Sequence, residues 1–180
     1  MSYIKTQLNS YKEFKKIKAL VLIAVMLALT TVAKMCAIYV LGNTVKLDLS
    51  NIPIAITAMM YGPFAGMLVG GLSDILQLCV APGAFIPGIT LSNALCGLVF
   101  GLFLYKSNCK PSCMIIPTSI NRLVINLFLS TFWISISFGS PYVPSLIPKL
   151  IINPIFFFAE ALILILVLPR ITKVLKNYGF

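Results

Sequence analysis

A few polar side chains lie inside long apolar stretches, and their chemistry is the most informative in the chain. Asp74 lies past the middle of one such stretch, Lys34 and Lys149 lie in two others, and Asn93 lies in a fourth. A charge near the centre of a bilayer costs about 2.5–3.5 kcal/mol on insertion scales, so each needs a partner or a function. Carboxylate, ammonium and amide groups together indicate a site that holds a polar ligand by hydrogen bonds.

These side chains are expected in one half of a membrane bundle, the half nearest the outside. Further hydrogen-bonding residues of that half are Trp133, Ser135 and Asn153. This grouping predicts one outward-facing pocket. The alternative is that lysines at positions 34, 46 and 149 extend to the membrane interface and that Asp74 pairs with one of them.

Two ionisable residues fall outside this group. Arg122 is expected nearer the cytoplasmic end of its apolar stretch, where it would extend to the interface or pair with phosphate groups. Glu160 lies in the middle of the last apolar stretch, and the sequence offers it no obvious local partner.

The elements that must position these residues are membrane-spanning helices. The chain of 180 residues is 59% hydrophobic, and its apolar runs are long enough to cross a bilayer as helices that satisfy their own backbone groups. We expect an all-α integral membrane protein with six transmembrane helices in one bundle. The expected spans run from about Ala19 to Leu41, Leu49 to Tyr61, Pro63 to Val80, from the end of the Ala81-to-Pro87 loop to Tyr105, Met114 to Phe138, and Ser145 to Leu168, the last closed by Pro169-Arg170.

The basic residues predict the orientation. Of fourteen Lys and Arg, ten lie in three clusters: Lys5, Lys12, Lys15, Lys16 and Lys18; Lys106 and Lys110; and Arg170, Lys173 and Lys176. Six crossings place all three clusters on one side, and the positive-inside rule makes that side the cytoplasm. We therefore expect one transmembrane domain over residues 1–180, with a cytoplasmic basic segment 1–18, a cytoplasmic basic tail 169–180 and both termini in the cytoplasm. Because the bases flank apolar runs, the formal charge of +10 predicts lipid contact and no nucleic-acid partner.

Several function classes are disfavoured by what the sequence lacks. It contains no histidine, and its five cysteines are scattered, so neither a metal site nor a metal cofactor is expected. There is no G-x-x-x-x-G-K-[ST] phosphate loop, and four carboxylates offer too few acids and bases for an intramembrane enzyme. A membrane protein with a binding pocket and no energy source predicts an energised partner.

Small residues spaced four apart predict close helix contacts. Gly66 and Gly70 form one such pair, and Gly97 and Gly101 form another, which we expect to pack within the chain. The third pair, Ala24 and Ala28, lies in the cytoplasmic half of the first span. It forms either a similar internal contact or a flat patch that receives another protein.

Several motifs in order along the chain resemble one family. The run from Phe85 to Ser92 (FIPGITLS), the preceding Ala81-Pro82-Gly83, the Gly62-to-Asp74 run, and the segments Ser130–Ile134 and Pro148–Ile155 are similar to the folate-specific substrate-binding (S) component of energy-coupling-factor transporters. Ala24-x-x-x-Ala28 is similar to the motif by which such subunits dock on a coupling protein. Three departures are lysine at positions 34 and 149, where arginine is expected, serine at position 130, where asparagine is expected, and a Val45–Pro53 segment that resembles riboflavin-specific members.

The resemblance implies a vitamin-uptake subunit of the bacterial cell membrane, with several crossings and no enzymatic activity of its own. It would capture folate from outside and deliver it with a transmembrane coupling protein and two ATPase subunits. Implied substrate-binding residues are Lys34, Asp74, Phe85, Asn93, Trp133, Tyr142 and Lys149; the implied partner-binding residues are Ala24 and Ala28. The alternatives are an S component for another vitamin, such as riboflavin, or a membrane interaction protein that transports nothing.

Overall fold

The computed structural model describes residues 17–40, 45–47, 49–81, 85–105, 111–139 and 142–177. The helices are α2 (Ile17–Met35), α3 (Asn51–Tyr61), α4 (Pro63–Val80), α5 (Pro87–Leu104), α6 (Pro111–Ile120), the π-helical η1 (Asn121–Leu129), α7 (Ser130–Phe138) and α8 (Tyr142–Asn177). Because α6, η1 and α7 follow one another without a break, they form one long rod. The helices thus make six rods, which correspond in order to the six apolar stretches of the sequence.

The rods differ in whether they can cross a membrane by length alone. Four are long and apolar enough to do so: Pro63–Val80, Pro87–Leu104, Met114–Ser137 and Lys149–Ile171. The apolar helices Ala19–Met35 and Asn51–Tyr61 are shorter. An α-helix rises about 1.5 Å per residue, so the eleven residues of α3 cover roughly half of a 30 Å hydrocarbon core. The structure therefore establishes an apolar helical bundle with four candidate spans.

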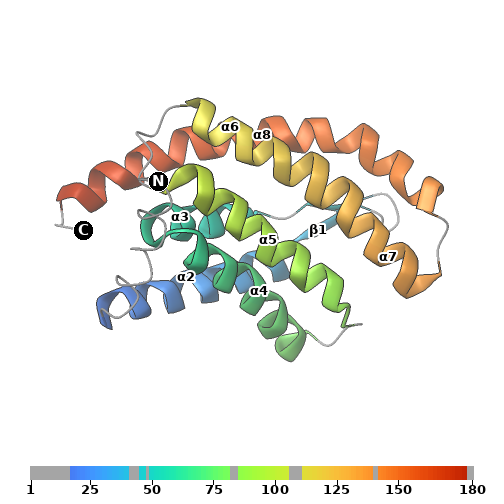
Figure 1. The fold of residues 1–180 in the computed structure, drawn as a ribbon, viewed down its shortest axis with the longest axis horizontal. Coiled ribbons are helices and arrows are strands. Elements are labelled where there is room, and N and C mark those ends of the chain that lie inside the picture. The colour runs from blue at the N-terminus through green and yellow to red at the C-terminus, as the bar shows by residue number, and fades with distance from the viewer. Residues whose placement is uncertain are drawn as a thin grey trace, which may run out of the picture.

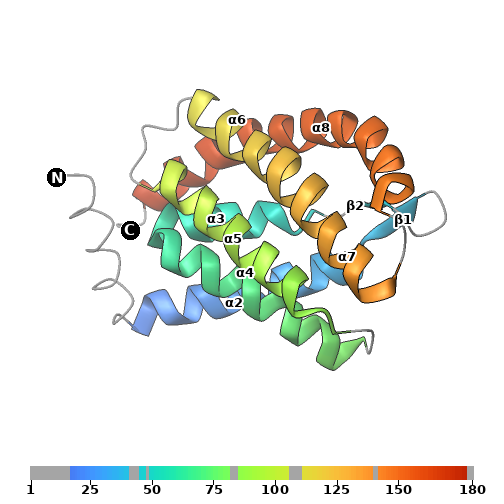
Figure 2. The same ribbon diagram turned by 45° about the vertical axis from the view of Figure 1, so that its right-hand side comes forward.

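The helices form two groups (Figures 1 and 2). Helices α4 and α5 pack side by side, and α2 and α3 pack against them. The rod α6–η1–α7 lies on the other side of α5 and packs against α8. The start of α2 and the end of α8 lie at one end of the bundle. We name the opposite end, where β1, β2 and the step from α7 to α8 lie, the hairpin end.

A short pair of strands connects α2 to α3. The strands β1 (Ile38–Val40) and β2 (Val45–Leu47) are antiparallel, with Tyr39 opposite Lys46. The sequence predicted a span as far as Leu41 and then a polar stretch. The chain leaves the helix earlier because Ile38, Tyr39 and Val40 are β-branched or aromatic residues that suit a paired strand.

The contact between α4 and α5 depends on glycine. A Cβ atom added to Gly97 would overlap the backbone of Gly66, and one added to Gly70 would overlap the carbonyl group of Asn93. Further along, Gly101 lies against Pro63 in the same way. The expectation that these glycines pack within the chain is confirmed. Close backbone approach of this kind is how membrane helices gain dispersion contacts.

Two helices differ from the sequence prediction near proline or polar residues. The predicted fifth span contains a π-helical segment, whose wide turns begin at Asn121 after Pro117 in α6. The predicted sixth span, closed by Pro169-Arg170, agrees with the candidate span, which ends at Ile171, but helix α8 itself continues to Asn177. Proline lacks a backbone donor, but helices in membrane proteins tolerate it where local adjustment compensates for the lost hydrogen bond.

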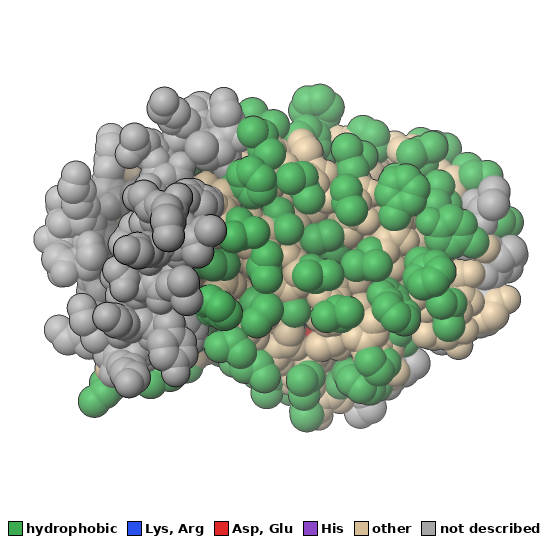
Figure 3. Space-filling view, in the orientation of Figure 1, with side chains coloured by type: hydrophobic (Ala, Val, Ile, Leu, Met, Phe, Trp, Pro, Cys, Tyr) green, Lys and Arg blue, Asp and Glu red, His purple; other side chains and the backbone are tan. Residues whose placement is uncertain are grey.

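The outer surface is predominantly apolar. Hydrophobic side chains spread over the described part of the face shown in Figure 3. On α2, Val21 and Val25 are each 59% exposed, and on α8 Ile151 and Phe158 are 68% and 71% exposed. Exposed apolar surface on this scale is unfavourable in water and favourable in lipid. The bundle therefore has the surface of an integral membrane protein.

The glycine contact gives a test with a matched control. Gly97→Ala is expected to force α4 and α5 apart, because its Cβ would overlap backbone atoms that have no room to move. Overpacking typically costs about 1–3 kcal/mol, equivalent to a loss of about 3–10 °C in thermal midpoint. Gly71→Ala is the control, since its Cβ would lie 3.5 Å from the Ala94 Cβ, an ordinary contact. Equal midpoints of the two variants in detergent would contradict this account.

Candidate functional site

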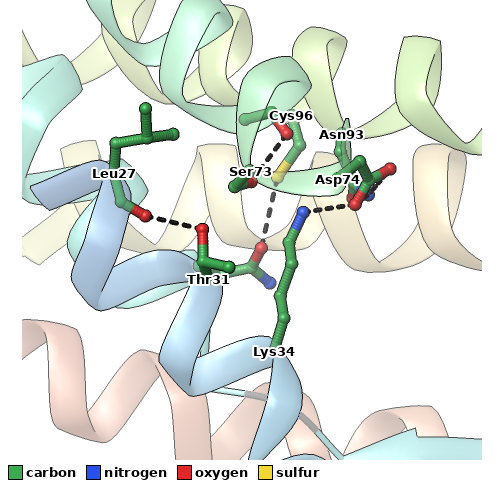
Figure 4. A network of polar contacts seen from close by, with 9 residues as sticks. Leu27, Thr31, Lys34, Ser73, Asp74, Asn93 and Cys96 are labelled. Atoms are coloured by element: carbon green, nitrogen blue, oxygen red, sulfur yellow. Dashed lines mark hydrogen bonds and ion pairs between the residues drawn. The ribbon is translucent and has the colours of Figure 1, made fainter. Parts of the chain in front are cut away.

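The first polar group joins three helices. The Lys34 ammonium of α2 forms an ion pair with the Asp74 carboxylate of α4. The Asn93 amide of α5 donates to both Asp74 oxygens, at 2.9 Å to Oδ1 and 2.8 Å to Oδ2. Figure 4 shows Lys34 and Asn93 reaching the carboxylate from different helices. The structure thus brings together three of the residues that the sequence singled out.

The local fold explains why these residues meet. Close packing of Gly70 on the Asn93 backbone places the two helices in contact one turn from Asp74. The neighbouring hydroxyl groups are satisfied within their own helices, since Ser73 donates to the Gly70 carbonyl and Thr31 to the Leu27 carbonyl. The polar atoms of this group are therefore directed by the glycine contact between α4 and α5.

This group is balanced in charge. Lys34 is 2% exposed and Asp74 9%, so neither side chain extends to the interface. The alternative in which Asp74 pairs with one of the lysines is confirmed, and Lys34 is the partner. The prediction that Lys34 extends to the interface is wrong, because the carboxylate 40 residues away stabilises its buried ammonium group.

The second polar group joins α7 and α8. Lys149 is 8% exposed and donates from Nζ to the Thr131 hydroxyl oxygen at 3.0 Å. Asn153, one helical turn further along α8, is 5% exposed, and its amide nitrogen has no hydrogen-bond partner among the described residues. Because residues four apart lie on the same helix face, Lys149 and Asn153 present an ammonium and an amide together. This group is rich in donors and has no carboxylate.

The three aromatic residues predicted for the site differ in how far they are buried. Trp133 of α7 packs directly on Gly88 of α5, where any added Cβ would overlap the indole ring. Its indole nitrogen is buried, without a hydrogen-bond partner in the part of the chain that the structure describes. Phe85 precedes α5 and is 57% exposed, and Tyr142 begins α8 half-buried. The described polar contacts do not join these two rings to either group.

Thr131 and Gly88 were not identified as site residues from sequence. Both fall inside the motif segments, yet a threonine and a glycine in apolar helices usually reflect packing. Only the contact with Lys149 and the contact with the Trp133 ring distinguish them.

The predicted interface position of Arg122 is also wrong. Its side chain is 6% exposed and pairs through Nε with the Glu160 carboxylate of α8. This contact gives Glu160 the partner that the local sequence did not reveal, because the two residues are 38 positions apart.

The two alanines of α2 face outward. Ala24 and Ala28 are both exposed, and the neighbouring Leu20, Val21 and Val25 are more than half exposed. Of the two alternatives left by the spacing, an internal contact therefore does not apply. The pair forms part of an apolar outer face of small and medium side chains.

The chemistry of the described residues is that of binding. No group of three or more Cys, Asp or Glu side chains capable of holding a metal ion occurs among them. The polar groups are an ion pair with an amide, and a lysine that donates to a threonine hydroxyl, both inside an apolar bundle. Ligand sites in proteins commonly combine a few such polar groups with apolar walls.

Comparison with known proteins identifies the family. A family model for the substrate-specific component of ECF transporters matches residues 18–176. The chain belongs to this family. Family membership makes it the substrate-binding component of a transporter, which agrees with its apolar helices.

Curated relatives and a solved structure are more specific. The chain is 28% identical over 121 residues to the folate transporter FolT of Clostridium novyi (strain NT), covering 67% of this chain and 70% of the relative. It is 24% identical over 145 residues to FolT of Leuconostoc mesenteroides subsp. mesenteroides, covering 76% and 77%. A crystal structure of FolT bound with folic acid superposes with a TM-score of 0.69 at 28% identity, covering 81% of this chain and 91% of that one.

The ion pair of the first polar group makes a stability prediction. Lys34→Met or Asp74→Asn alone leaves one buried charge without its partner, which typically costs about 3–5 kcal/mol. The double variant removes both charges and should recover most of that loss. The measurement is a double-mutant cycle of thermal midpoints in detergent. Additive losses in the double variant would show that the two side chains do not stabilise each other.

Proposed function

We propose that the chain is the folate-binding subunit of an ATP-driven ECF-type uptake transporter. It captures the vitamin at the extracellular side and delivers it with a transmembrane coupling protein and two ATPase subunits. The observation that carries the proposal is the combination of family membership with relatives and a bound structure that concern folate. The two buried polar groups support it, because they carry acceptor and donor atoms of the kind that such a ligand could contact.

The proposed topology has six crossings and cytoplasmic termini. The start of α2 and the end of α8 lie at the same end of the bundle, as an even number of crossings requires. Basic residues follow the end of the last candidate span, including Lys173 and Lys176. The positive-inside rule then directs this end to the cytoplasm and the hairpin end to the outside. In this arrangement α2 and α3 complete the bundle although neither is long enough to count as a span alone.

The two polar groups suit different parts of folate. Asp74 and Asn93 offer acceptor and donor atoms for the flat pterin edge, and Lys34 already balances the charge of Asp74. Lys149 has a neutral hydroxyl partner, and Asn153 adds an amide donor without an acceptor. A carboxylate is the ligand group that such a donor cluster favours. We therefore assign the anionic glutamyl tail to Lys149 and Asn153, and the pterin to Asp74 and Asn93.

The aromatic residues provide the apolar contacts. Trp133, held against Gly88, presents a large ring whose position is fixed by the absence of a side chain on α5. Phe85 and Tyr142 lie near the ends of the helices that they precede or begin. Stacking of aromatic rings contributes about 0.5–1.5 kcal/mol beyond apolar burial. These residues would cover the ring system after it enters.

The outer face of α2 is the proposed docking surface for the coupling protein. Ala24 and Ala28 are exposed and small, so a partner helix can approach the backbone closely. The chain would then carry no energy source of its own and would use the ATPases through this contact.

Binding of the ligand is the first test. Folate is expected to quench the fluorescence of Trp133, the one tryptophan of the chain, in a saturable titration, and riboflavin is not. Lys149→Met is expected to weaken folate binding by about tenfold or more, since a hydrogen bond to a charged group contributes about 1.5–3 kcal/mol. The affinity for pteroic acid, which lacks the glutamyl tail, should fall much less in the same variant.

The outcomes of that titration separate the alternatives. Saturable riboflavin binding would show that the vitamin is riboflavin, and the chain would still be a transporter subunit. If Lys149→Met lowers the affinity for folate and for pteroic acid equally, the assignment of the glutamyl tail to Lys149 is wrong. Absence of any saturable ligand would favour a membrane interaction protein.

Docking is tested separately from binding. Ala28→Trp is expected to reduce folate uptake at least tenfold in cells that contain the energising module, while leaving folate affinity of the isolated chain unchanged. Ile155→Trp on α8 is the matched control, because Ile155 is an apolar side chain 65% exposed on a different helix. Uptake lost equally in both variants would contradict a specific role for the α2 face.

A further inference from the structure

A second buried ion pair lies outside both polar groups. Arg122 and Glu160 are each 6% exposed, and the arginine Nε donates to the Glu160 carboxylate. The guanidinium carbon also lies 5.9 Å from the centre of the Phe156 ring. Glu160 and Phe156 are four residues apart on α8, so one arginine side chain contacts two successive turns of that helix.

This ion pair connects the two helical rods that carry Thr131, Lys149 and Asn153, which we call the donor cluster. Arg122 is the second residue of η1, which continues directly into α7 and Thr131. On α8, Glu160 belongs to the buried face that also carries Asn153 and Lys149. The two rods are thus connected by polar contacts at two levels, Thr131 with Lys149 and Arg122 with Glu160.

The surroundings of the pair leave its geometry dependent on the charges. A cavity beside it is lined by Leu49, Ile52, Arg122, Phe156, Ala159, Glu160 and Ile163. This pocket is open on one side, so fewer protein side chains pack against the pair there than in a closed interior. The charge-assisted hydrogen bond between the two side chains is directional, and the attraction of their charges is stronger in a low-dielectric interior than in water.

The π-helical segment increases the importance of this anchor. A π turn contains more residues than an α turn, so it changes which face the following helix presents. The segment begins at Asn121, immediately before Arg122, and ends one residue before α7. A contact that fixes its first turn therefore also restricts the rotation of Thr131.

We propose that Arg122 and Glu160 are a positioning pair. Their ion pair fixes the position of α8 relative to η1 and α7, and so keeps Lys149 and Asn153 close to Thr131. The inference rests on the proposed function in one respect, which is that Lys149, Asn153 and Thr131 bind the anionic end of the ligand. A pair that merely neutralises two buried charges would have no effect on the distant cluster.

The test replaces the pair with apolar residues of similar size. Arg122→Met/Glu160→Leu should fold, because buried ion pairs exchanged for apolar side chains often leave stability equal or higher. Folate affinity is expected to fall by about tenfold, the size typical of lost coupling between neighbouring groups. The matched control is Leu123→Met/Leu162→Met, two exposed positions on the same two helices, which should bind as the original chain does.

A distance measurement gives a readout that needs no ligand. Spin labels at positions 136 on α7 and 147 on α8, where the isoleucines are 61% and 53% exposed, report the spacing of the two helices in a chain whose five cysteines are replaced. The distance distribution is expected to broaden or shift in the apolar variant and to stay unchanged in the control.

Each outcome decides the proposal. An unchanged distance distribution in the folded apolar variant overturns it, whatever the folate affinity. A changed distribution with weakened folate binding supports it. A changed distribution in a chain that binds no folate even when unmodified supports the positioning pair and rejects the proposed ligand.

Discussion

The close approach of α4 and α5 is the contact on which the remaining structure depends. Gly66, Gly70, Gly97 and Gly101 allow backbone to lie against backbone along both helices. Lipid offers apolar groups the same environment as a neighbouring helix, so this fit, and not hydrophobic burial, must hold the pair together. The same contact places Asp74 beside Asn93, which makes the binding chemistry a consequence of helix packing.

Charge pairing is the second organising feature. Lys34 with Asp74 joins α2 to α4, and Arg122 with Glu160 joins η1 to α8. Each pair connects helices within one of the two groups, so electrostatics reinforces each group internally. The two groups meet where Trp133 of one packs on Gly88 of the other, and the proposed ligand site lies there. A ligand that contacts Asp74 and Lys149 would therefore bridge two bodies that are each held together independently.

The sequence predicted the helical rods well because an apolar run in a membrane has little alternative to a helix. It also identified Lys34, Asp74 and Asn93 as polar residues requiring partners. It did not reveal which lysine pairs with Asp74, or that Arg122 pairs with Glu160. The paired residues are 40 and 38 positions apart, so their contact depends on how separate helical rods are rotated about their axes. The β1–β2 pair, the π-helical segment and the continuation of α8 past Pro169 depend on small local energy differences that apolar patterning does not report.

The internal pairing of charges has an electrical consequence. Movement of one elementary charge through the full membrane potential involves about 2.3 kcal/mol per 100 mV. The charges of Lys34, Asp74, Arg122 and Glu160 sum to zero, so these residues would add no net charge to any movement of the subunit across the bilayer in the proposed transport cycle. Among the described residues Lys149 is a buried cation with a neutral partner, and the two carboxylates of a folate tail would exceed its single charge. In the proposed transport cycle the membrane potential would therefore act in opposite directions on the empty site, which carries the lysine charge, and on the loaded site, which carries the excess charge of the ligand.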